Sequence, residues 1–129
     1  MRNSYGLSVE LSDDGVAKPL SQAARAILYR AIRELLINVA KHAGAAKARL
    51  ATRNAGSSLI ATVSDAGAGF DPTEVASRPQ RGLGLNSMRE RLSFIGGSVE
   101  ITSAPGHGTR VTLTAPLQKP EQATEETVK

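Results

Sequence analysis

Four polar residues in one stretch of the sequence have the types and the spacing to bind a metal ion and phosphate groups. They occupy positions i, i+4, i+7 and i+8 of a segment without glycine or proline, and they are Glu34, Asn38, Lys41 and His42. At about 100° per residue they share one arc of a helix, beside an apolar arc. An amide oxygen is a ligand for Mg²⁺, and a lysine ammonium is a point charge for phosphate. The same spacing is typical of an ordinary solvated helix face with i,i+4 pairs, so alone it leaves both interpretations open.

A second group of residues follows a predicted strand and reads Asp65-Ala-Gly67-Ala-Gly69-Phe70. Its two glycines allow backbone turns and the close approach of a ligand. The Asp65 carboxylate, at the mouth of the strand, could accept a hydrogen bond from the amine of a base. A plain turn has the same composition, so this group too is ambiguous by itself.

Two more glycine pairs complete the candidate chemistry. Gly82-Leu83-Gly84-Leu85 opens a predicted helix, where free backbone N–H groups favour an anion. Gly106-His107-Gly108-Thr109 stands at the start of a predicted strand. No Gly-x-Gly element continues as Gly-x-Gly-x-x-Gly, and no Gly-x4-Gly-Lys-Ser/Thr occurs, which excludes the dinucleotide fingerprint and the Walker phosphate loop.

The elements that must position these residues can be predicted from periodicity. The strongest prediction is a helix over 22–43, with Ser21 as its N-cap and Gly44 beyond its end. A long loop is predicted over 65–84. Strands are predicted over 5–11, 45–53, 57–64, 98–103 and 109–115, and a second helix over 85–95. This order predicts an α+β two-layer sandwich, a mixed and mostly antiparallel sheet covered on one face by helices.

Composition narrows the class of protein. The chain has 129 residues, which suits one domain, and no cysteine, which excludes disulfides and thiolate metal sites. It has no apolar run of about 20 residues and no signal-like start, so we expect a cytoplasmic domain. The net charge of +4 favours an anionic partner. We expect an extension over 1–4, one domain over 5–117 and a disordered tail over 118–129.

The order and spacing of the four motifs resemble the ATP-binding domain of the GHKL (Bergerat) superfamily, which includes gyrase-type ATPases, heat-shock chaperones, sensor histidine kinases and mismatch-repair ATPases. The helix motif resembles the N box, Asp65–Phe70 the G1 box, Gly82–Leu85 the G2 box, and Gly108-Thr109 the closing motif. Details such as Lys41-His42-Ala43 are most similar to sensor kinases of the nitrate-sensor and lipid-fluidity-sensor group. The resemblance covers about residues 5–117.

The resemblance implies a role for each matching residue. Asn38 would coordinate Mg²⁺, and Lys41 and His42 would contact the phosphates of ATP. Asp65 would bind the adenine amino group, with Thr109 supporting it. The remaining nucleotide contacts would come from Gly67, Gly69, Arg81, Gly82, Leu83, Gly84 and Leu85, with residues 70–81 as the ATP lid. Glu34 matches the position that activates water in hydrolysing members, so Glu34 and Lys41 are the candidate catalytic residues.

The resemblance also implies partners. A sensor kinase phosphorylates a histidine on a dimerisation domain, and nothing like that domain is in this chain; neither His42 nor His107 is expected to be the acceptor. The full-length kinase, which could carry a membrane anchor elsewhere, would pass the phosphoryl group to a response regulator. The domain alone should show little turnover and contact neither membrane nor nucleic acid. The alternatives are a stand-alone serine kinase of the anti-sigma-factor type and a basic nucleic-acid-binding module.

Overall fold

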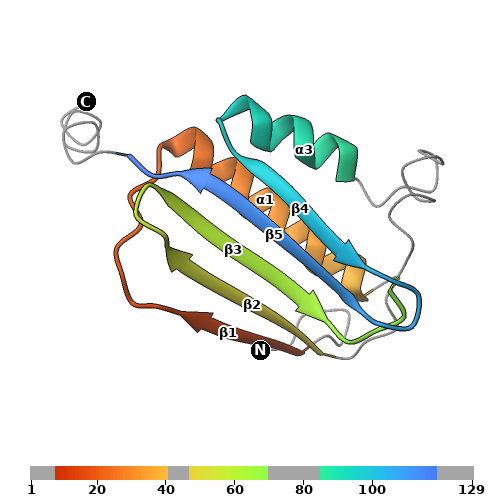
Figure 1. The fold of residues 1–129 in the computed structure, drawn as a ribbon. Helices are drawn as coiled ribbons and strands as arrows, with labels where there is room; N and C mark the ends of the chain where they lie inside the picture. Colours follow the sequence, from red (N-terminus) through yellow and green to blue (C-terminus); the bar gives the residue numbers. More distant parts are fainter. Residues whose placement is uncertain (1–7, 41–46, 70–84, 119–129) are drawn as a thin grey trace.

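The computed structural model describes residues 8–40, 47–69 and 85–118 and has two layers. Figure 1 shows both helices lying against the same face of one sheet. The helices are α1 (Gln22–Asn38) and α3 (Leu85–Phe94), and the strands are β1 (Ser8–Asp13), β2 (Lys47–Asn54), β3 (Ser58–Asp65), β4 (Ser98–Ser103) and β5 (Thr109–Pro116). The predicted α+β sandwich is confirmed. Neither helix in these described ranges is long and apolar enough to cross a membrane.

The sheet has the strand order β1-β2-β3-β5-β4. Strand β1 runs parallel to β2, whereas the other three pairings are antiparallel, as the predicted mixed sheet requires. The turn Asn54-Ala55-Gly56 joins β2 to β3, with Gly56 at a φ of 97°. Because β5 lies between β3 and β4, the end of β3, the end of β4 and the start of β5 meet at one edge of the sheet.

The core lies between the sheet and the two helices and is aliphatic. Alternate residues of β3 and β5 face the helices and are buried, among them Val63 and Leu113. The buried side chains Leu28 and Leu35 of α1 and Met88 and Leu92 of α3 pack against them. Fully burying such a side chain stabilises the fold by about 1.5–3 kcal/mol. The helices are therefore fixed on the sheet by contacts that leave their other faces free for polar residues.

Helix α1 begins where it is predicted to begin but ends earlier than predicted. The Ser21 side chain accepts a hydrogen bond from the Ala24 N–H at 3.0 Å, as an N-cap does. The helix ends at Asn38 rather than at residue 43, and residues 39–40 form a π turn in which the Val39 N–H reaches the carbonyls of Leu35 and Leu36. The predicted cap at Gly44 lies outside the described residues.

The first strand is shifted relative to its prediction over 5–11. Strand β1 continues to Asp13, because that residue pairs with Thr52 of β2 and its Oδ1 accepts a hydrogen bond from the Thr52 hydroxyl at 2.7 Å. Residues 5–7 lie outside the described ranges. At the other end of the domain, the Gln118 N–H donates to the Pro19 carbonyl at 2.9 Å. The predicted domain limits and tail otherwise stay predictions.

Candidate functional site

Asp65 is the last residue of β3, and the sheet places it beside the closing motif. It lies opposite Thr109 of β5, and Thr109 lies opposite Ser103 of β4. The Asp65 Oδ1 accepts a hydrogen bond from the Gly67 N–H at 2.8 Å, which fixes the carboxylate over its own turn. Within the described part of the chain, Oδ2 has no hydrogen-bond partner. One carboxylate oxygen is thus anchored, and the other can accept a hydrogen bond from a ligand.

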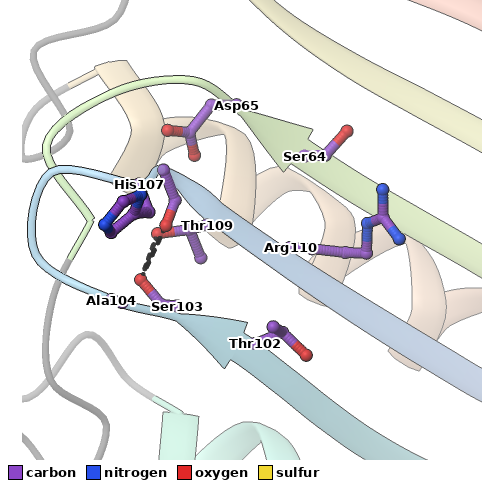
Figure 2. Close-up of a pocket in the computed structure, with 9 residues that line it drawn as sticks. Ser64, Asp65, Thr102, Ser103, Ala104, His107, Thr109 and Arg110 are labelled. Carbon is purple, nitrogen blue, oxygen red and sulfur yellow. Dashed lines mark hydrogen bonds between the residues drawn. The ribbon is translucent and has the colours of Figure 1, made fainter.

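The two hydroxyl groups next to Asp65 have a defined polarity. The Ser103 hydroxyl donates to the Gly108 carbonyl at 2.9 Å and lies 2.8 Å from the Thr109 hydroxyl (Figure 2). A serine hydroxyl has one hydrogen, so the Thr109 hydroxyl is the donor of the second bond. The Thr109 oxygen keeps lone pairs and no hydrogen for a ligand. Asp65 and Thr109 therefore both present acceptors, which suits a ligand or a water that donates hydrogen bonds.

Glycines allow two turns to pack closely at this edge of the sheet. A β carbon on Gly69 would overlap the carbonyl oxygen of Ala104, and Gly69 has a φ of 67°. The Gly106 N–H donates to the Ala68 carbonyl, which joins the segment after β3 to the β4–β5 turn. Packing between turns therefore requires glycine at residue 69, and the contact of Gly69 with a base stays a prediction.

An open cavity of about 320 Å³ lies at this edge (Figure 2). The residues that line it are Ser64, Asp65, Thr102, Ser103, Ala104, His107, Gly108, Thr109 and Arg110. The volume is at the lower end of the range for small-molecule sites, about 300–1,000 Å³. Asp65 and Thr109, which the sequence predicts as neighbours, are therefore brought together at one cavity. His107, Arg110 and Ser64 were not predicted there, because their neighbourhood depends on strand order.

Two of the predicted N-box residues, Glu34 and Asn38, lie on α1. Asn38 is its last residue and is half-buried, and Glu34 lies one turn earlier on the same face. Each Glu34 oxygen contacts a guanidinium group: Oε2 lies 2.9 Å from Arg91 Nη2 of α3, and Oε1 lies 3.4 Å from Arg30 Nε. The sequence did not predict the contact with Arg91, because no local pattern relates residues so far apart in the chain.

Several predicted site residues fall outside the described ranges. These are Lys41, His42, Arg81, Gly82, Leu83 and Gly84. Leu85 begins α3, and its side chain is not described. In the described ranges, no group of three or more His, Cys, Asp or Glu side chains could hold a metal ion.

Comparison with known proteins decides the family. Residues 23–119, well over half of the chain, match the family of histidine kinase-, DNA gyrase B- and HSP90-like ATPases. The chain belongs to that family. As a member of this ATPase family it is an ATP-binding domain, and the predicted resemblance is confirmed. The sheet edge with Asp65 and Thr109 corresponds to the G1 and closing motifs on which that resemblance was based.

Two proteins that this ATPase-family domain resembles are histidine kinases. The chain is 36% identical to the sensor histidine kinase MctS of Rhizobium johnstonii over 114 residues, which is 88% of this chain and 24% of MctS. It is 37% identical to the histidine-protein kinase/phosphatase UhpB of Salmonella typhimurium over 97 residues, which is 75% of this chain and 18% of UhpB. The chain thus spans a quarter or less of these relatives.

Solved structures agree with this assignment. The histidine kinase domain of the blue-light activated kinase of Erythrobacter litoralis EL346 is 25% identical, with a TM-score of 0.66 over 95% of this chain and 56% of that chain. The histidine kinase AdeS of Acinetobacter baumannii is 16% identical, with a TM-score of 0.72 over 89% of this chain and 56% of that chain. The likeness to AdeS shows the shared fold. The catalytic ATP-binding domain of a histidine kinase is the type that these comparisons support.

Proposed function

We propose that this domain binds Mg·ATP and donates the γ-phosphate to a histidine on the dimerisation domain of a sensor kinase. The observation that carries the proposal is the arrangement at the end of β3. There a carboxylate with one anchored oxygen, and one oxygen that has no hydrogen-bond partner among the described residues, lies beside a threonine that presents only lone pairs. The 6-position of adenine carries an amino group that donates hydrogen bonds, whereas the 6-position of guanine carries an acceptor oxygen, so this acceptor pair, directly or through a water, matches the 6-position of adenine.

The phosphates would lie toward the end of α1. Asn38 offers an amide oxygen, a hard ligand of the kind that Mg²⁺ accepts, and phosphate oxygens and waters would complete its coordination. Bound Mg²⁺ would neutralise charge that develops on the phosphoryl oxygens. Lys41 and His42 would bind the phosphate chain, and so would the backbone of Gly82 and Gly84. The protein's share of the catalysis would be alignment and charge neutralisation, because phosphoryl transfer has a loose transition state.

The acceptor histidine would come from another domain. His107 lies exposed in the glycine-rich β4–β5 turn rather than on a helix, so it is a poor candidate. We propose that the full-length kinase supplies the acceptor and then phosphorylates a response regulator. The domain would act in the cytoplasm, where ATP is available. No observation favours the anti-sigma-type serine kinase or the nucleic-acid module over this proposal.

Calorimetry tests the adenine assignment. Wild type should bind Mg·ATP and Mg·ADP, and Asp65→Asn should bind both about 10- to 100-fold more weakly, because a hydrogen bond to a charged group contributes about 1.5–3 kcal/mol. The amide of Asp65→Asn can also donate a hydrogen bond, so the preference for ATP over GTP should shrink. The control is Glu100→Gln, which removes one negative charge at an exposed position of β4. Equal binding by wild type and Asp65→Asn would refute the assignment of Asp65.

A further inference from the structure

An ion pair joins the two helices on the outer layer of the domain. The Glu34 Oε2 of α1 lies 2.9 Å from the Arg91 Nη2 of α3, and these side chains are only 30% and 26% exposed. The second contact of Glu34, with Arg30, is longer at 3.4 Å, and the Arg30 side chain is 67% exposed. Exposed and poorly aligned pairs contribute little, so Arg91 is the main partner of the Glu34 carboxylate.

Each residue of the ion pair is held in place by a buried neighbour in the sequence. Leu35 follows Glu34, Leu92 follows Arg91, and both leucines are buried. The two backbones are therefore fixed, and the side chains meet across a short span between packed helices. Arg91 contacts Glu34 through Nη2, at the tip of its guanidinium group. The Arg91 Nε is buried and has no hydrogen-bond partner in the described ranges. An unsatisfied buried donor costs stability, so this pair is not the most stabilising arrangement of two helices.

The position of this pair relates it to the proposed metal site. Glu34 precedes Asn38 by one helical turn, so both project from the same face of α1. Helix α3, which carries Arg91, begins at Leu85. The ion pair thus links α1, which carries the proposed Mg²⁺ ligand, to the helix whose start follows the G2 motif.

We propose that Arg91 is a positioning residue for Mg·ATP: it holds the Glu34 carboxylate and thereby fixes α3 against the Asn38 turn of α1. In this arrangement Glu34 is an anionic anchor. A proton acceptor needs a lone pair directed at the reacting group, whereas each Glu34 oxygen here contacts a guanidinium nitrogen. This inference rests on the proposed function, because it assigns a role in the same nucleotide site.

The experiment separates metal-dependent from metal-independent nucleotide binding by the 129-residue chain. ATP affinity is measured with Mg²⁺ and with a chelator in wild type, Arg91→Met, Glu34→Gln and the double variant. Arg91→Met should weaken Mg·ATP binding about tenfold, as loss of a residue behind a metal ligand does, and should change metal-free binding less than about twofold. Glu34→Gln should have a smaller effect, because its amide oxygen still accepts from Arg91. The double variant should be no weaker than Arg91→Met, because the two residues act as one unit.

Control variants distinguish this role from simple stabilisation. Arg89→Met removes an exposed arginine of the same helix that has no partner in the described ranges, and it should leave both affinities unchanged. Arg91→Lys keeps the charge and should recover much of the Mg·ATP affinity. Arg91→Gln, which removes the charge but stays polar, replaces Arg91→Met should the methionine variant not fold, and the same tenfold loss of Mg·ATP affinity is expected of it. The inference would be overturned by losses of ATP affinity in Arg91→Met and Glu34→Gln that add up in the double variant. Losses of affinity that are equal with and without Mg²⁺ would also overturn it. Should wild type bind no ATP, the proposed function itself fails; binding lost in Asp65→Asn but unchanged in Arg91→Met would overturn only this inference.

Discussion

Gly108 packs so closely on Asp65 that a β carbon at residue 108 would overlap the Asp65 carbonyl oxygen. Gly108 is also buried and has a φ of 75°, which side chains rarely allow. The β4–β5 turn is therefore pressed against the backbone of the residue that we assign to adenine. Through this contact the position of the Asp65 carboxylate depends on a residue 43 positions later in the sequence.

Gly108→Ala should destabilise the domain by at least about 2 kcal/mol, because strain at positive φ and the overlap with Asp65 act together. Urea denaturation measures the effect. The matched control is Gly106→Ala in the same turn: Gly106 has a φ of 80°, but a β carbon there meets nothing within 4 Å. The free energy of unfolding of Gly106→Ala should fall only by the cost of the left-handed conformation, about 1–2 kcal/mol. Equal losses in the two variants would mean that contact with Asp65 is unimportant.

Thr109→Val should weaken ATP binding about three- to tenfold, since it removes the hydroxyl but keeps the branched shape, and loss of the hydrogen bond to Ser103 should lower the free energy of unfolding by about 1 kcal/mol. The reason is the hydrogen bond from the Thr109 hydroxyl to Ser103, which leaves the Thr109 oxygen as an acceptor beside Asp65. Thr109→Ser should keep most of the affinity, provided that the shorter side chain keeps this contact. The control is Thr112→Val, a half-buried residue of the same strand. A Thr109→Val affinity equal to that of wild type would contradict the supporting role.

Acid should destabilise the domain partly through a cluster at the end of β1. The Lys18 ammonium lies 2.6 Å from carboxylate oxygens of Asp13 and Asp14. Hydrogen bonds from Lys18, and then from Thr52 to Asp13 and from the Asn54 N–H to Asp14, hold the pKa of both carboxyls below the ordinary value of 3.8. Their contribution is complete above that ordinary value and is lost as the pH falls through the lower folded-state values.

Lys18→Met should therefore flatten the acid limb of the stability curve below about pH 4, where wild type loses the contribution of the two carboxyls. The pKa of Lys18 is raised above 10.5 by the same two aspartates, so its contribution is present at neutral pH and is lost only at strongly alkaline pH. Urea midpoints between about pH 2 and 7 provide the test, with Lys47→Met, an exposed lysine of β2, as the control. Parallel acid limbs in Lys18→Met and wild type would contradict this account.

Local signals in the sequence were enough to predict most of the fold. Ser21 before an apolar periodicity specified the start of α1, and the glycine turn at 54–56 specified the β2–β3 hairpin. The pairing of β1 with β2 was not predictable, because alternation shows that a segment is a strand without showing its neighbour. The end of α1 was also missed, since the sequence continues with good helix formers beyond Asn38.

That Asp65 and Thr109 are neighbours could be predicted, because each of their motifs adjoins a strand. Asp65 and Thr109 stand at strand ends, and the sheet does bring them to one edge. What the sequence could not show is the tertiary partner of each residue. Arg91 pairs with Glu34 from another helix, and Gly69 faces the Ala104 carbonyl of a different turn. Such contacts depend on how helices and turns pack after the strands have found their order.

Glu34→Gln in the full-length kinase distinguishes an anchor from a base at saturating Mg·ATP. A catalytic base contributes about 10²–10⁴-fold, so its loss would lower the rate of autophosphorylation by at least about a hundredfold and would change its pH profile. Because the Glu34 oxygens contact Arg91 and Arg30, we expect a fall of less than about tenfold and an unchanged pH profile. The control is Glu90→Gln, which removes the charge of an exposed glutamate on α3. A hundredfold loss confined to Glu34→Gln would assign the carboxylate to proton transfer, and the ion pair with Arg91 would then be a feature of the resting domain alone.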